Sequence, residues 1–170
     1  MSTTGIEPTT RKLPLPRYPE ELISSNAFLL KRLGFFAKER GMAAYEDTGL
    51  NPYHHAILVV LDQGALETQG AIADRLGYDR GQLVGMLDEL EEQGLVERRR
   101  DPDDRRRHIV QMTPAGRKAL GKLRAIAALL EDELFVPLDE SARDELHRLL
   151  LRLAEHHLPG CQLGSFETPS

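Results

Sequence analysis

The chain has few of the residues that secreted proteins and oxidant sensors depend on. Its 170 residues include one cysteine and no tryptophan, and aromatic residues make up only 5% of the total. A single cysteine cannot form a disulfide within the chain, which favours a reducing cytoplasm as its location. Cys161 follows a Pro-Gly pair and has no cationic neighbour in sequence to activate a thiolate, which favours an incidental cysteine. The alternative is a redox-sensing cysteine influenced by His156 and His157.

Long apolar runs and catalytic motifs are also missing. No apolar stretch approaches the roughly 18 to 20 residues of a membrane span, and the N-terminus does not resemble an export signal. Glycine-rich phosphate loops, nucleophile elbows and metal motifs are absent, and the histidines of the last helix lack ligand spacing. We therefore expect no enzyme activity, cofactor or metal, and no membrane partner.

The charge, in contrast, is distributed unevenly. The formal net charge is −5, yet six of the ten residues from Arg98 to Arg107 are arginine. Arginines concentrated in one loop are typical of contact with a phosphate backbone or a narrow minor groove. An acidic chain does not bind polyanions over its whole surface, so any contact with nucleic acid has to be local.

Apolar periodicity and capping residues predict a mainly α fold with a small β-hairpin wing, that is, a winged helix-turn-helix plus a helical dimerisation region. A long helix is expected over about 19–45 and another over 52–63 with Asn51 as its cap. Thr68 and Asp79 cap the next two helices, which Gly77 and Gly94 end, and Thr113-Pro114 starts a helix that runs to about Phe135. Asp139 or Ser141 opens the last helix, to about His157. Short strands are expected at Leu95–Arg98 and His108–Met112, on either side of the arginine loop.

The two helices joined by Gly77 and Tyr78 form a helix-turn-helix, in which the start of the second helix enters a major groove. Arg80 can donate two hydrogen bonds to guanine and Gln82 can pair with adenine. The alternative is that both side chains simply face water. The basic hairpin that follows favours double-stranded DNA as the partner.

A second class of function is a winged-helix module that binds protein without specific DNA binding. A wing used for protein contact is more often apolar, whereas this one is rich in arginine. DNA affinity that falls steeply with salt is expected only for the DNA-binding protein, and would separate it from this module and from an enzyme.

Several segments of the chain resemble the MarR family of winged helix-turn-helix regulators. These are Gln69–Gly77, Leu87–Val96, Asp101–Arg107 and Met112–Gly116, with an Asp-x-Arg wing followed by a Thr-x-x-Gly helix start. The match covers about 20–157. The resemblance implies an obligate homodimer, and it implies that Asp104 orients Arg106 toward the minor groove. The expected DNA-contacting residues are Thr68, Gln69, Arg80, Gln82, Arg98, Asp104, Arg105 and Arg106.

Gly81 and Gly85 depart from the family pattern, because many relatives have larger side chains at these positions of the recognition helix. Each glycine costs about 1 kcal/mol of helix stability against alanine. Either the backbone approaches the groove unusually closely here, or Arg80 and Gln82 make most of the base contacts.

The last helix is denser in leucine than one intrachain stripe requires, which favours a second chain as its cover. The alternative is that these leucines pack only on the first helix.

We expect residues 1–18 to be a flexible arm, 19–157 a single domain and 158–170 a tail. Within that domain, the winged lobe spans about 50–113 and the dimerisation helices about 19–46 and 114–157. A two-fold dimer would bind an inverted repeat with half-sites about 10 bp apart.

The resemblance also implies a small aromatic or phenolic effector in a cleft between the dimerisation helices and the winged lobe. That cleft would collect Phe35, Phe36, Arg40, Tyr53, His54 and His55. Adjacent histidines on a helix point about 100° apart, so both cannot face one pocket squarely. The alternative is that one packs in an interface while the other caps a helix or faces solvent. By resemblance, repression that the effector relieves is expected.

Overall fold

The computed structural model describes residues 17–64, 67–102, 104, 107–158 and 160. The chain forms two units, Met1–Phe36 and Ala37–Ser170, and helix α2 contains the boundary between them. The boundaries expected at residues 18 and 157 stay predictions.

The first unit holds α1 (Glu20–Ile23) and the start of α2 (Asn26–Tyr45). The prediction of one helix over 19–45 is therefore wrong at Ser24–Ser25. The Ser25 hydroxyl accepts a hydrogen bond from the amide of Phe28 at 3.3 Å, which caps a new helix and ends the short one before it. Tyr18 packs edge-on against Phe28, and Arg32 lies over the Tyr18 ring.

The second unit contains the helices of the winged lobe. These are the 3₁₀ turn η1 (Glu46–Thr48), α3 (Pro52–Gln63), α4 (Gln69–Leu76) and α5 (Arg80–Glu92). Asn51, Thr68 and Asp79 cap α3, α4 and α5 through side-chain oxygens that accept backbone N–H bonds, as predicted.

The wing is formed by β2 (Val96–Arg100) and β3 (His108–Met112), antiparallel strands that pair from Val96–Met112 to Arg100–His108. A two-residue strand that the sequence did not predict, β1 (Glu67–Thr68), pairs with the outer side of β3 and gives the order β1-β3-β2. This strand ties the start of α4 to the wing.

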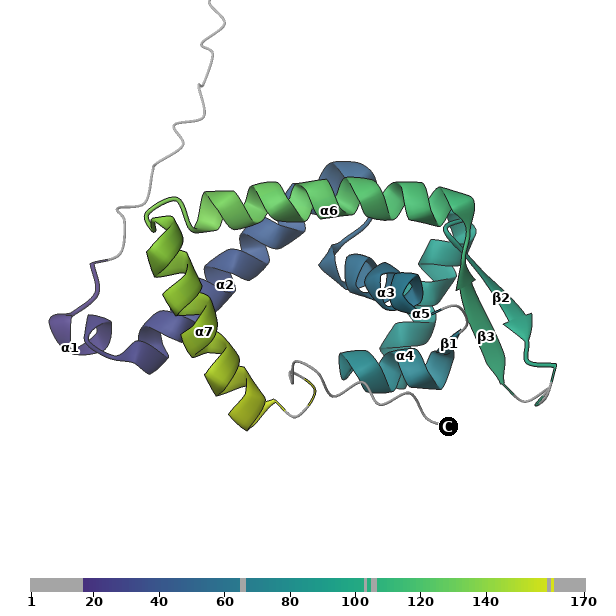
Figure 1. The fold of residues 1–170 in the computed structure, drawn as a ribbon, viewed down its shortest axis with the longest axis horizontal. Coiled ribbons are helices and arrows are strands. Elements are labelled where there is room, and N and C mark those ends of the chain that lie inside the picture. Colours follow the sequence, from purple (N-terminus) through teal and green to yellow (C-terminus); the bar gives the residue numbers. More distant parts are fainter. Residues whose placement is uncertain (1–16, 65–66, 103, 105–106, 159, 161–170) are drawn as a thin grey trace, which may run out of the picture. The chain divides into compact units, whose positions relative to one another are not determined.

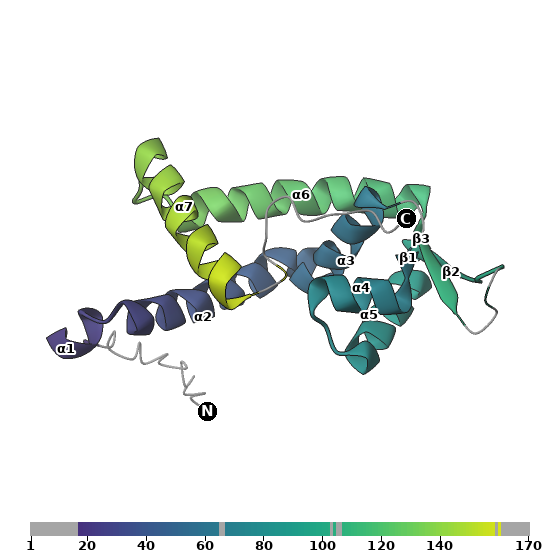
Figure 2. The ribbon, with the colours of Figure 1, turned by 60° about the horizontal axis from the view of Figure 1, so that its bottom comes forward.

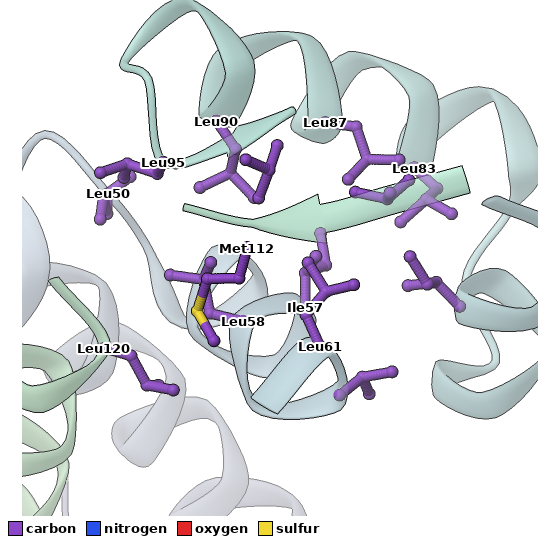
Figure 3. Close-up of a cluster of buried hydrophobic side chains, with 14 of the residues drawn as sticks. Leu50, Ile57, Leu58, Leu61, Leu83, Leu87, Leu90, Leu95, Met112 and Leu120 are labelled. Carbon is purple, nitrogen blue, oxygen red and sulfur yellow. The ribbon is translucent and has the colours of Figure 1, made fainter. Parts of the chain in front are cut away.

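The core of the lobe lies between α3, α5 and β3, as Figure 3 shows for Ile57, Leu87 and Met112. Leu83, Leu87 and Leu90 form the inward stripe of α5, and each is at most 1% exposed. Leu120 and Leu123 extend the core to α6. Val110 of β3 is also fully buried, which anchors the wing in the lobe.

Two helices follow the wing. α6 (Pro114–Leu134) starts at the Thr113 cap and runs from the wing to a turn before α7 (Glu140–His157), as Figures 1 and 2 both show. Arg143 of α7 pairs with Asp132 of α6 at 3.0 Å. The expected fold class, mainly helical with a β-hairpin wing, is confirmed. No helix among the described residues has the length and apolar character needed to cross a membrane.

Candidate nucleic-acid interface

The helix-turn-helix is built from α4, the Gly77–Tyr78 turn and α5. Gly77 adopts φ 64°, a left-handed conformation that glycine enters without steric cost, and the amide of Tyr78 donates to the Ala73 carbonyl at 3.0 Å. Ala73 is 1% exposed, and its small side chain suits the close contact between α4 and α5. The Asp79 carboxylate accepts from the amides of Gly81 and Gln82 and fixes the direction in which α5 leaves the turn.

The N-terminal part of α5 is open to solvent. The Arg80 side chain is 76% exposed, and its guanidinium lies 3.6 Å from the Asp74 carboxylate on α4. Gln82, Gly81 and Gly85 are exposed as well. A Cβ added at Gly85 would meet no atom within 4 Å, so the glycine is not required by packing within the chain.

Three of the expected DNA-contacting residues gather around one concave surface, a hollow of about 510 Å³ between α4, α5 and the loop end of β3 in the wing. Thr68 and Gln69 stand at the start of α4, where backbone amides point outward and favour an anion. The residues that line the hollow are Thr68, Gln69, Gly70, Ala71, Asp74, Arg80, Arg107 and His108.

Arg107, His108 and Asp74 were not among the residues selected from the sequence. Arg107 belonged to the recognised arginine loop, so the signal for it was present. The place of Asp74 depends on the packing of α4 against α5, which no local pattern indicates.

Arg98 is engaged within the protein. Its guanidinium contacts Glu91 at 2.5 Å and Asp88 at 2.6 Å, both on α5, and its own backbone amide donates to Glu91 at 2.9 Å. The side chain is 21% exposed, and its hydrogen bonds hold the pKa of the Glu91 carboxyl below the ordinary value. A DNA contact by Arg98 stays a prediction, and these contacts weigh against it: the side chain joins the wing to α5 and would have to leave both carboxylates to reach a phosphate.

At the tip of the wing, Asp104 pairs with Arg107 at 3.2 Å, and the amide of Arg107 donates to the Asp104 carbonyl. The amide of Asp101 in turn donates to the Arg107 carbonyl. Arg105 and Arg106, including the expected Asp104–Arg106 pair, lie outside the described residues.

The two adjacent histidines of α3 face different neighbours. His54 is 1% exposed and its Nε2 lies 3.1 Å from the Glu89 carboxylate on α5. His55 Nδ1 lies 2.7 Å from the Tyr45 hydroxyl on α2. Burial lowers the pKa of both imidazoles; Glu89 partly opposes this at His54, and Arg124 adds to it at His55.

The other residues expected around an effector also have separate surroundings. Arg40 pairs with Glu133 of α6, and Tyr53 packs edge-on against Tyr78 of the helix-turn-helix turn. Phe36 belongs to the first unit and is half exposed. Within the second unit, Arg40, Tyr53 and the two histidines thus contact different elements, and their role around an effector stays a prediction.

Comparison with known proteins agrees with this geometry. A MarR family model matches residues 48–107, which span the helix-turn-helix and most of the wing. Over 129 residues, 71% of this chain and 78% of its relative, the sequence is 30% identical to a Thauera aromatica protein whose name describes a transcriptional regulatory protein for the hcr operon. The chain belongs to the MarR family.

Solved structures of MarR-family regulators have the same fold. The repressor CouR, bound to a 23-mer DNA duplex, superposes with a TM-score of 0.73 at 34% identity, over 79% of this chain and 96% of that one. CouR from Rhodococcus jostii RHA1 bound to p-coumaroyl-CoA gives a TM-score of 0.67 at 26% identity, over 80% and 96%. This MarR-family protein is thus a winged-helix transcriptional regulator and not an enzyme.

Proposed function

We propose that this regulator is a homodimeric repressor that binds an inverted repeat through α5 and the wing of each subunit. The observation that supports this most strongly is the hollow shared by Thr68, Gln69, Arg80, Arg107 and His108. It brings a helix N-terminus, the start of a recognition helix and the loop end of a basic wing onto one surface.

Each part of this surface has a separate task. Arg80 and Gln82 enter the major groove and contact bases, Arg80 through a bidentate pair with guanine. Thr68, Gln69 and Arg107 contact phosphates and set the register of α5 on the duplex. Arg105 and Arg106, with Asp104 beside them, extend these contacts along the backbone or into the minor groove.

The dimer is supported by apolar side chains that the chain itself leaves uncovered. Leu149, Leu150, Leu153 and Leu158 are between 37% and 56% exposed at the C-terminal end of the fold. In the first unit, exposed apolar side chains include Leu30, Leu33, Phe35 and Phe36. A second copy of the chain would bury these side chains and form a dimer whose two lobes are related by a two-fold axis. Two such lobes match half-sites about 10 bp apart.

The proposed effector is a small aromatic compound, free or as a coenzyme A thioester. CouR supports the thioester form, because that regulator has been solved with p-coumaroyl-CoA and shares the fold of this chain. Arg40, Tyr53, His54 and His55 of the second unit stay proposed pocket residues. Binding there would favour a spacing of the lobes that no longer fits successive major grooves.

Two arginine variants test the DNA contact on a site recovered by selection from random duplexes. Arg107→Ala is expected to weaken binding to every sequence and to lower the salt slope by about one. Arg80→Ala is expected to weaken the selected site more than random DNA, because it removes a base contact.

Lys122→Ala serves as the charge-matched control, since Lys122 is an exposed lysine of α6 outside the hollow. Equal losses on selected and random DNA for Arg80→Ala would contradict its role in base contact. Binding that is weak, unselective and indifferent to salt would instead favour a protein-interaction module.

A further inference from the structure

The recognition helix exposes one large apolar side chain, that of Val84. It is 42% exposed, although the apolar stripe of α5 at Leu83, Leu87 and Leu90 is buried. The other exposed positions that the structure describes on α5 are glycine, polar or charged: Arg80, Gly81, Gln82, Gly85, Asp88, Glu89 and Glu92. A single exposed valine is ordinary on a protein surface, so its meaning depends on its position.

Val84 lies one helical turn after Arg80, on the same side of α5. Residues at this spacing are neighbours on a helix surface, so a helix placed with Arg80 at the bases brings Val84 to the groove with it. Gly81 and Gly85 flank Val84 and have no side chains to cover it. A valine on a helix is held in one main rotamer, so its two methyl groups are fixed in direction before any partner arrives.

The next turn of the helix does not offer a competing contact at the groove. Asp88 follows Val84 at the same spacing, but its carboxylate is engaged by Arg98 at 2.6 Å. Glu91 is engaged by the same guanidinium. Beyond Val84 on this side of α5, the helix is therefore engaged by Arg98 of the wing.

Base edges in the major groove present hydrogen-bonding groups and one apolar group, the 5-methyl of thymine. We propose that Val84 contacts a thymine methyl and is a specificity-determining residue of this regulator, which rests on the proposed DNA binding through α5. Four helical residues rise about 6 Å, and base pairs stack about 3.4 Å apart. The thymine thus lies one or two base pairs from the pair that Arg80 contacts.

Deoxyuridine tests this contact directly, because it differs from thymidine only by the missing methyl. Each thymine of the selected site is replaced in turn, and dissociation constants are measured for the wild type and for Val84→Ala. The wild type is expected to lose about four-fold in affinity at one thymine per half-site, the amount for one methyl leaving an apolar contact. Val84→Ala is expected to bind the thymine and uracil versions of that position equally.

Glu92→Ala is the matched control, an exposed substitution on the same helix that should keep the wild-type sensitivity to uracil. Alanine also has a higher helix propensity than valine, so loss of folding is not expected to mask the result. The inference is overturned if the wild type tolerates uracil everywhere, or if Val84→Ala remains as sensitive as the wild type. Both results leave the proposed DNA-binding function standing, whereas failure to recover any selected site overturns the function and the inference together.

Discussion

At the joint between the wing and α6, close contacts decide which residue fits, and helix propensity does not. A Cβ on Gly116 would lie 2.1 Å from the Leu95 carbonyl oxygen and 2.7 Å from Met112 Cγ, so only glycine fits there. Beside it, the Thr113 hydroxyl donates to the Gly94 carbonyl at 2.7 Å and accepts from the amide of Gly116. This joint sets the angle at which the wing leaves α6.

Gly116→Ala should lower stability by about 1 to 3 kcal/mol or more, because backbone atoms of Leu95 have to move to admit the methyl group. Gly121→Ala is its matched control on the same helix, where an added Cβ meets nothing within 4 Å. That control should instead stabilise the protein by about 0.5 to 1 kcal/mol. Thermal unfolding of both variants measures the difference, and equal melting temperatures would contradict the close approach at Gly116.

His54 should make stability depend on pH. Burial lowers its pKa from the ordinary 6.5, so the unfolded chain takes up a proton at a pH where the folded protein does not. The free energy of unfolding therefore falls as the pH drops through 6.5. Urea unfolding at about pH 7.5 and about pH 5.5 should show this loss in the wild type and a smaller loss in His54→Gln. An unchanged loss in the variant would assign the pH dependence to other groups, including His55.

At the scale of elements, contacts at two places join the wing to the helix-turn-helix. Arg98 of β2 contacts Asp88 and Glu91 of α5, while β1 fixes the start of α4 to β3. We expect a wing held in this way to limit how far Arg107 moves relative to Arg80, both of which line the hollow. Such preorganisation lowers the ordering cost of DNA binding.

Arg98→Met should keep much of the packing of this side chain while removing its charge. We expect a loss of about 1 kcal/mol in stability, since the ion pairs are partly exposed. The salt slope of DNA binding should stay unchanged, because no phosphate contact is lost. Arg107→Met is the comparison and should lower that slope by about one. Equal reductions of the salt slope for both variants would show that Arg98 also contacts a phosphate.

Local sequence patterns predicted most of the elements but few of the contacts between them. The caps at Asn51, Thr68, Asp79 and Thr113 are confirmed, and of the two alternatives for the last helix Asp139 is the cap, because each cap depends on a few neighbouring residues. The strand β1 is too short to show a period, and the Ser24–Ser25 break interrupts an otherwise continuous apolar pattern.

For the candidate site too, local sequence patterns predicted the region and not the contacts between its elements. The hollow around Arg80 could be expected from the helix-turn-helix and the basic loop. The pairing of Arg98 with Glu91 could not be, because it requires β2 to fold back on α5. The contact between His54 and Glu89 depends likewise on α3 packing against α5.

At the scale of the whole molecule, the proposed repressor has to be a dimer for its two lobes to bind an inverted repeat. Leu146, Leu149, Leu150 and Leu153 share one side of α7, and Leu153 is 52% exposed. Glu155 lies on the opposite side of the same helix.

Leu153→Glu should therefore halve the mass in solution, because a charge placed in an apolar interface opposes association. Sedimentation equilibrium should give twice the chain mass of 19.1 kDa for the wild type and one chain mass for the variant. Glu155→Ala should remain dimeric. A wild type that sediments as a monomer at every concentration would contradict the proposed dimer.

The central claim is that α5 and the wing bind a specific inverted repeat in DNA. The most direct measurement is a binding selection from random duplex DNA, with affinities for the recovered sites determined at two salt concentrations. We predict an enriched inverted repeat with half-sites about 10 bp apart, bound with an affinity that falls steeply as salt rises. No enriched sequence, together with weak binding that is indifferent to salt, would contradict the account.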